Sequence, residues 1–258
     1  MYKIKSFGQH FLKNDHIALR IVEQLIVNDQ IGSNVVEIGP GEGILTQFLL
    51  QRPEILNLFV VELDKRLPEI LLKKFPKLEG HIINEDFLRV SLDSYLSAPF
   101  SVIGNFPYNI STQIVFKILD NRDAIPQMVG MFQKEVARRI ASGPGNKDYG
   151  VTSVLVQAYY DVKYCFSVEA GNFDPPPKVQ SGVIRLQRTH VYESQINDHN
   201  LFRQVVKLSF GQRRKMLRNA LSELTIDEAA LPPEQLSRRA EQLTVTEFIQ
   251  LANNAAKK

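Results

Sequence analysis

The chain has 258 residues, 44% of them hydrophobic, and a formal net charge of +3. A chain of this length can bury one large core, or a large core and a smaller one. No apolar run reaches the roughly 18 residues of a membrane span, and the N-terminal segment lacks the apolar stretch of a signal peptide, so we expect a soluble protein of the cytoplasm. Cys165 is the only cysteine and the five histidines lack ligand spacing, which disfavours disulfide bonds and a metal site.

Apolar spacing predicts strands and helices that alternate along the first 141 residues. Helices are expected at 17–26, 43–50, 66–75, 111–119 and 134–141, and the first of them follows Asn14 as its N-cap. Strands are expected at 34–38, 58–63, 81–86, 100–104 and 127–132. This alternation is typical of a mostly parallel sheet with helices on both faces.

The pattern changes after a glycine-rich loop at 142–150. A helix around 151–160 is followed by strands at 162–168 and 182–186 with no helix between them, which predicts an antiparallel hairpin at one sheet edge. From about residue 190 the spacing predicts helices only, at 201–210, 213–224, 232–243 and 244–255. We therefore expect an α/β domain over residues 1–189 and a small helical domain over 190–258.

Three glycines, Gly39, Gly41 and Gly43, separate the first predicted strand from the next helix. Glycine lets the backbone approach a ligand closely, and the helix N-terminus presents N–H groups to it. A dinucleotide fingerprint needs its third glycine at the position of Ile44, so a nicotinamide-dependent dehydrogenase is disfavoured. Glu62 ends the second strand, where a carboxylate can accept hydrogen bonds from ribose hydroxyls.

Polar residues also end the third and fourth predicted strands. Asp86 can accept from an adenine amine while the ring of Phe87 or a backbone amide frames the base. Asn105 opens the sequence Asn-Phe-Pro-Tyr, in which Pro107 favours an extended residue before it and a fixed loop. Because open α/β sheets bind ligands at the carboxyl ends of their strands, we expect these side chains to share one rim with the glycine loop.

The motifs taken together resemble one family. In chain order over residues 5–220 they are SFGQHFLKN, EIGPGEGILT, VELD, NEDFL, GNFPYNIST, NFDPPPKVQSGVIRL and FGQRRKMLRNAL. On these the chain is identified as a member of the class I S-adenosylmethionine-dependent methyltransferases, and within them of the ribosomal RNA adenine dimethyltransferases of the small-subunit group. The resemblance implies a Rossmann-like α/β domain, with a mostly parallel seven-stranded sheet ending in an antiparallel hairpin, and a small C-terminal helical domain.

The resemblance also implies the reaction and its substrate. Two methyl groups would pass from S-adenosylmethionine to N6 of each of two adjacent adenines near the 3′ end of small-subunit (16S) ribosomal RNA in an assembling 30S subunit, with a monomer as the enzyme. Asn105 and the backbone carbonyl held by the Phe106-Pro107 frame would accept the amine hydrogens. Tyr108 would stack on the extruded base, and Phe173 would close its other side.

For the cofactor, the resemblance assigns a set of residues along the first 105 positions: His10, Leu12, Gly39, Gly41, Glu62, Asp86, Phe87 and Asn105. Two positions depart from the usual family pattern. His10 stands where bacterial members more often have asparagine, and Phe106 stands where they have leucine. The second change matters little if only the backbone carbonyl of Phe106 is used.

A basic segment runs from Leu201 to Ser222, with six Lys or Arg and no acid. An apolar stripe of Met216, Leu217, Ala220, Leu221 and Leu224 predicts a helix that docks by this face. Its basic residues would then contact RNA phosphates, with Arg214 and Arg218 as an i, i+4 pair. The predicted RNA-binding residues are Arg213, Arg214, Lys215 and Arg218, and the alternative RNA surface lies around Lys3, Lys5 and Lys13.

Two other functions are compatible with parts of this pattern. A large-subunit ribosomal RNA methyltransferase of the macrolide-resistance type shares the Asn-x-Pro-Tyr core, although FGQRRKMLRNAL is more similar to the small-subunit group. A non-catalytic RNA-binding relative can retain the same fold. The intact Glu62, Asp86 and Asn105-Phe106-Pro107-Tyr108 favour an enzyme.

Overall fold

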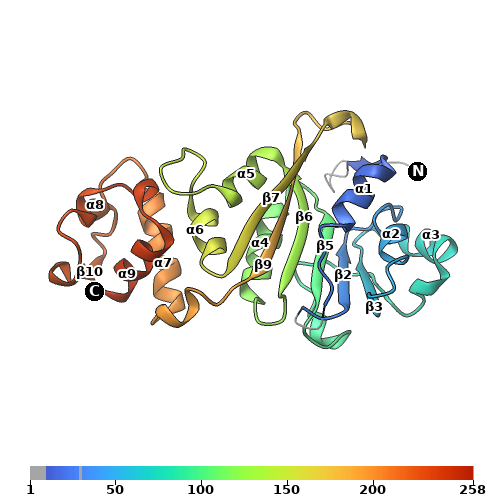
Figure 1. The fold of residues 1–258 in the computed structure, drawn as a ribbon, viewed down its shortest axis with the longest axis horizontal. Coiled ribbons are helices and arrows are strands. Elements are labelled where there is room, and N and C mark those ends of the chain that lie inside the picture. Colours follow the sequence, from blue (N-terminus) through green and yellow to red (C-terminus); the bar gives the residue numbers. More distant parts are fainter. Residues whose placement is uncertain (1–9, 29–30, 258) are drawn as a thin grey trace. The chain divides into compact units, whose positions relative to one another are not determined.

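The computed structural model describes residues 10–28 and 31–257. Its main feature is a seven-stranded sheet in the order β4-β3-β2-β5-β6-β9-β7 (Figure 1). The strands are β2 (Asn34–Ile38), β3 (Asn57–Val61), β4 (Ile82–Ile83), β5 (Ser101–Asn105), β6 (Gln127–Gln133), β7 (Tyr160–Val168) and β9 (Ser181–Arg188). Neighbouring strands in the series β4-β3-β2-β5-β6 pair in parallel, whereas β6 and β9 pair antiparallel. The predicted mixed sheet is confirmed.

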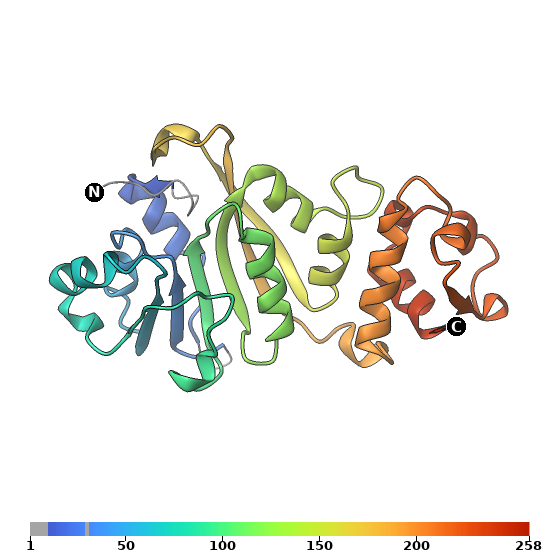
Figure 2. The ribbon, with the colours of Figure 1, turned by 180° about the vertical axis from the view of Figure 1, so that it is seen from behind.

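Helices alternate with these strands and continue beyond them. They are α1 (Asp15–Val22), α2 (Thr46–Leu49), α3 (Leu67–Lys74), α4 (Ser111–Asp120), α5 (Lys134–Ala141), α6 (Val151–Gln157), α7 (His199–Gly211), α8 (Leu217–Ala220) and α9 (Val245–Asn253). Helix α1 lies in front of the sheet in Figure 1, and α4 lies in front of it in Figure 2, so both faces are covered. None of the helices in the described part of the chain has the length and apolar character needed to cross a membrane.

Helix α1 shows how local signals and packing share control of an element. The Asn14 side chain caps the helix by accepting from the Ile17 amide at 3.2 Å, as its position predicts. The helix ends at Val22, four residues before the predicted end. The Arg52 guanidinium donates to the carbonyls of Val22 and Leu25 at 3.0 and 2.8 Å. A distant arginine therefore satisfies carbonyls that would otherwise need a continuing helix.

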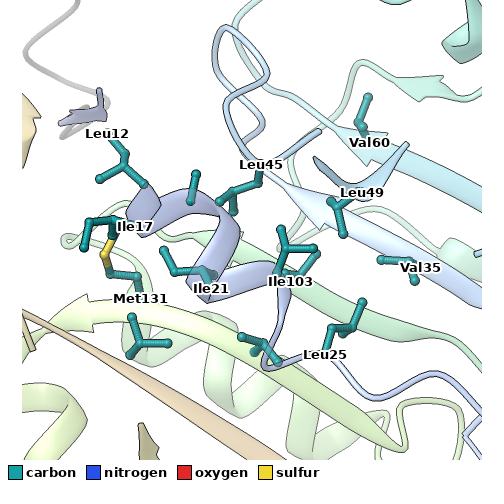
Figure 3. Packing of buried hydrophobic residues seen from close by; sticks show 14 of the residues in the cluster. Leu12, Ile17, Ile21, Leu25, Val35, Leu45, Leu49, Val60, Ile103 and Met131 are labelled. Atoms are coloured by element: carbon teal, nitrogen blue, oxygen red, sulfur yellow. The ribbon is translucent and has the colours of Figure 1, made fainter. Parts of the chain in front are cut away.

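The core of the sheet region lies between α1, α2 and the strands. Figure 3 shows Ile17, Ile21 and Leu25 from the first helical segment packed with Ile103 of β5 and Met131 of β6. All five side chains are at most 9% exposed. Burial of an aliphatic side chain contributes about 1.5 to 3 kcal/mol, so this face holds α1 against the sheet.

A pairing that the local pattern did not predict ties the start of the chain to residues far along it. Strand β1 (Phe11–Leu12) runs antiparallel to β8 (Phe173–Asp174), with Leu12 opposite Phe173. The side chain of Asn14 extends the contact by donating to that of Asn172 at 2.8 Å. Residues 11–14 are thereby joined to residues 172–174.

Contacts between residues divide the chain into two compact units. One contains Met1–Ala137 and Lys163–Arg188, and the other contains Arg138–Val162 and Thr189–Lys258. The second unit thus includes α6 in addition to the C-terminal segment. The functional division into a methyltransferase domain over 1–189 and an RNA-contacting domain over 190–258 stays a prediction.

The second unit contains strands as well as helices, so the prediction of helices alone after about residue 190 is wrong. Strand β10 (Leu224–Ile226) pairs antiparallel with β11 (Ala255–Lys257). The helix predicted over 213–224 is limited to the four residues of α8, and the one over 232–243 is replaced by short 3₁₀ turns. Helical propensity is weak, and tertiary partners override it here: the Leu217 amide donates to the Arg238 carbonyl at 2.9 Å.

Candidate active site

The glycine loop after β2 uses its three glycines in different ways. All three have positive φ, at 63°, 59° and 84° for Gly39, Gly41 and Gly43, a region that favours glycine. A Cβ on Gly41 would lie 2.9 Å from Phe11, and one on Gly43 would lie 2.3 Å from Phe75. A Cβ on Gly39 would meet nothing within 4 Å. The backbone at Gly39 therefore borders open space, as a ligand cradle requires.

A cavity of about 240 Å³ lies at the carboxyl ends of the parallel strands. Most of the predicted site residues line it: His10, Gly39, Gly41, Glu62, Asp86, Phe87, Asn105, Pro107 and Tyr108. A second cavity, of about 620 Å³, shares Gly39, Gly41 and Asn105 with the first and is also lined by Leu12. The parallel register thus brings the ends of four strands to one rim, as predicted.

Glu62 follows β3 and is 5% exposed. Its Oε1 accepts from the Asp64 amide at 2.8 Å, and its Oε2 accepts from the Gly41 amide at 3.4 Å. Burial raises the pKa of Glu62, and the amide hydrogen bonds oppose that rise. The carboxylate is held between the glycine loop and the turn after β3, with lone pairs left for ligand hydroxyls.

Asp86 and Phe87 lie in the loop after β4. The Asp86 Oδ1 accepts from the Leu88 amide at 2.9 Å. The ring of Phe87 is almost fully buried. The loop thus presents a carboxylate, an aromatic surface and backbone groups to one cavity, a combination suited to a planar base.

Asn105 is the last residue of β5, and its side-chain orientation is set from outside the sheet. The amide Nδ2 donates to the His10 carbonyl at 3.0 Å, which leaves Oδ1 as the acceptor of this side chain. The next residue, Phe106, is 1% exposed and meets Phe132 edge to face at 5.1 Å. Burial of this ring anchors the loop, which explains how phenylalanine serves where leucine is usual.

Two contacts hold the Tyr108 ring. Its hydroxyl shares a hydrogen bond with the Ser181 hydroxyl at 2.6 Å, and Ser181 is fully buried. The His10 ring lies 5.4 Å away at an interplanar angle of 30°. His10 is itself fixed because its Nδ1 donates to the Pro175 carbonyl at 2.8 Å. Two segments distant in sequence, at His10 and at residues 175–181, therefore meet at the loop after β5.

Comparison with known proteins agrees with this arrangement. Residues 2–257 match the sequence model of the family described as ribosomal RNA adenine dimethylase. The chain belongs to this family. It is 48% identical over 249 residues to the ribosomal RNA small subunit methyltransferase A of Cytophaga hutchinsonii, covering 96% of this chain and 95% of that protein. The corresponding protein of Parabacteroides distasonis is 50% identical over 250 residues, with 96% and 91% covered.

Solved structures support the fold assignment for this dimethylase. A dimethyladenosine transferase from Plasmodium falciparum superposes with a TM-score of 0.77 at 22% identity, covering 94% of this chain and 96% of the other. The 23S rRNA methyltransferase ErmE superposes with a TM-score of 0.72 at 23% identity, covering 95% and 98%. The predicted class I methyltransferase fold is confirmed, and membership of the family confirms S-adenosylmethionine as its cofactor.

Phe173 lies in a different place from the other predicted catalytic residues of this dimethylase. Its ring is 1% exposed and belongs to the hydrophobic core, where it packs with Leu12, its partner in the β1–β8 pair. It is not among the described residues that line either cavity. A role for Phe173 in covering the base stays a prediction, and it requires the ring to leave the core.

The sequence pattern did not single out Glu37, a buried carboxyl beside the glycine loop. Glu37 is 1% exposed in β2 and accepts from the Thr46 hydroxyl at 2.6 Å. Burial raises its pKa to about 8, and Glu62 adds to the rise. Glu37 also lines the larger cavity. An acid inside the apolar strand VVEI was the available signal.

The basic segment before α8 differs from the predicted helix. Arg213 pairs with Glu241 at 3.4 Å and Arg218 pairs with Glu228 at 2.7 Å. Arg214 and Lys215 have no ionic partner within the described residues. They precede α8, so the predicted i, i+4 pair of Arg214 and Arg218 on one helix is wrong.

The apolar stripe of that segment is also shorter than predicted. Met216 is 52% exposed, whereas Leu217, Ala220, Leu221 and Leu224 are buried as expected. Of the basic residues near the N-terminus, Lys13 lines the larger cavity. Lys3 and Lys5 lie outside the described residues.

Proposed function

We propose that this protein transfers methyl groups from S-adenosylmethionine to N6 of adenines in small-subunit ribosomal RNA. The observation that carries the proposal is the cavity in which Glu62, Asp86 and Asn105 meet. The curated relatives support the small subunit as the target by their names. At finer detail we propose two adjacent adenines near the 3′ end of 16S RNA, in an assembling 30S subunit.

The residues of the cavity suit the cofactor. Gly39 leaves room for a close approach of the ligand to the backbone. The Glu62 carboxylate would accept from the ribose hydroxyls, and Asp86 and Phe87 would hold the adenine. When bound, S-adenosylmethionine supplies a methyl group on a positively charged sulfur. The chain contributes binding and orientation of the two reactants.

Asn105 and the backbone beside it would orient the target amine. The lone pair of an exocyclic adenine amine is delocalised into the ring, so acceptors for both N–H groups favour a pyramidal nitrogen with an available lone pair. The Asn105 Oδ1 is one acceptor, oriented by the His10 carbonyl. The Pro107 carbonyl already accepts from the Ile110 amide at 3.2 Å, so we assign the second acceptor to the Phe106 carbonyl.

Tyr108 would support the target base by stacking, which contributes roughly 1 to 3 kcal/mol per base. Its hydroxyl is engaged by Ser181, so the ring has a defined plane before RNA arrives. Such preorganisation lowers the entropy lost when the extruded base enters.

For RNA outside the cavity, we propose that Arg214 and Lys215 contact phosphates. Neither has an ionic partner among the described residues. Arg213 and Arg218 are engaged by glutamates, but exposed ion pairs contribute only about 0 to 1 kcal/mol and can exchange for phosphate contacts.

Methyl transfer from labelled S-adenosylmethionine to three substrates tests the proposal. The substrates are unmethylated small subunits, large subunits and protein-free ribosomal RNA, each followed by nucleoside analysis. We expect dimethyladenosine on small subunits, and a loss of about 10² to 10³ in rate for Asn105→Ala, as for removal of a preorganised polar group. Label on large subunits would instead favour the resistance-type reaction. Cofactor binding without transfer to any substrate would favour a non-catalytic relative.

A further inference from the structure

Lys117 makes an unusual set of contacts from the last turn of α4. Its Nζ donates to the Phe87 carbonyl at 2.5 Å and to the Val90 carbonyl at 2.6 Å. The same Nζ lies 5.0 Å from the centroid of the Phe87 ring. All these contacts are to the loop between β4 and β5, so one ammonium joins α4 to that loop.

The loop makes further hydrogen bonds within itself. The Asp86 carbonyl accepts from the amides of Arg89 and Val90, both at 2.9 Å, and the Asp86 side chain accepts from Leu88. These bonds shape the turn but do not attach it to the rest of the fold. Burial lowers the pKa of Lys117 and the nearby Asp86 opposes that change. The ammonium thus supplies both charge and donors to the loop.

The loop also forms a wall between two cavities. Phe87 lines the cavity of about 240 Å³ that holds the candidate site. Phe87 and Lys117 both line another cavity, of about 200 Å³. The side chains of Phe87 and Val90 are buried, so packing fixes one side of the loop, while the hydrogen bonds from Lys117 hold its backbone carbonyls.

We propose that Lys117 is a positioning residue for the adenine end of the cofactor site. By holding the carbonyls of Phe87 and Val90, it keeps Asp86 and the Phe87 ring in the arrangement that receives the base. Lys117 acts from behind the wall and does not line the cavity of the candidate site. The inference rests on the proposed function, because it assumes that this cavity binds the cofactor.

The test compares Lys117→Met with a matched control, Lys73→Met, which removes a lysine with a 76% exposed side chain from α3. Calorimetry with S-adenosylhomocysteine measures the dissociation constant, and hydrogen exchange of the ligand-free protein measures local opening of residues 85–91. We expect Lys117→Met to raise the dissociation constant by about ten- to a hundredfold, the equivalent of hydrogen bonds to a charged group. Exchange should accelerate in residues 85–91 and remain unchanged in β2 and β5. The control should match wild type in both measurements.

Lys117→Gln keeps a shorter donor, so we expect its dissociation constant to lie between those of wild type and Lys117→Met. It also keeps the test valid if the methionine variant does not fold. Unchanged binding by either variant would overturn the inference, and so would faster exchange spread equally over the sheet, which would indicate a general structural role. If wild type itself does not bind S-adenosylhomocysteine, the proposed function fails; if wild type binds and the variants bind equally well, only the role of Lys117 fails.

Discussion

Replacing Glu37 by glutamine should change how the stability of the protein depends on pH. Glu37 lies in β2 at 1% exposure, with the Thr46 hydroxyl as its hydrogen-bond donor. Because burial raises the pKa of Glu37 from its ordinary 4.5 to about 8, the folded protein keeps a proton that the unfolded chain releases. Below the ordinary pKa both states are protonated and the folded state has no penalty. As pH rises toward 8, the folded state loses stability relative to the unfolded chain.

The size of the effect follows from the shift. A change from 4.5 to about 8 is about 3.5 pKa units, and at about 1.4 kcal/mol per unit it corresponds to roughly 5 kcal/mol. The loss accumulates at up to about 1.4 kcal/mol per pH unit between the two values and levels off above 8. In Glu37→Gln the side chain stays neutral and its carbonyl oxygen can still accept from Thr46, so this part of the slope disappears.

Urea unfolding of wild type and Glu37→Gln at pH 5, 6, 7 and 8 measures the free energy of unfolding directly. We expect the free energy of unfolding of the variant, relative to that of wild type, to increase by about 1 kcal/mol or more for each unit by which the pH rises. Glu69→Gln is the control, because Glu69 has a 78% exposed side chain and should leave the curve parallel to wild type. Parallel curves for Glu37→Gln would show that Glu37 titrates normally, which would refute the argument from burial.

Other predictions concern the candidate site and the RNA surface. Tyr108→Phe and Ser181→Ala should each slow methylation about five- to tenfold, and the double variant should lose no more than either, because both remove the same 2.6 Å hydrogen bond; additive losses would argue against a shared role. Glu62→Ala should weaken S-adenosylhomocysteine by at least about tenfold in calorimetry and spare subunit binding, whereas an unchanged dissociation constant would remove Glu62 from the ribose site. Replacing Arg214 and Lys215 together by glutamine should flatten the salt dependence of subunit binding by about 0.7 to 0.9 for each phosphate that the protein no longer neutralises, and an unchanged slope would place the RNA surface elsewhere.

Much of the site was predictable because it depends on short-range rules. Apolar spacing located the parallel strands, and parallel strands bring their carboxyl ends to one edge. Glu62, Asp86 and Asn105 each stand at such an end, so their shared cavity follows from three local patterns and one topological rule. The positive φ of Gly39 and Gly41 follows similarly from the turn between strand and helix.

The contacts that orient those side chains were decided only by the tertiary structure. The His10 carbonyl that holds Asn105 is 95 residues away in the chain, and the Ser181 hydroxyl that holds Tyr108 is 73 residues away. No periodicity encodes such pairs, because they depend on how separately formed elements pack. The same reason applies to Phe173: its motif predicted a ring at the base, and its pairing with β1 buries it in the core. Local sequence thus determines which groups reach the rim, and packing over long separations determines which way they point.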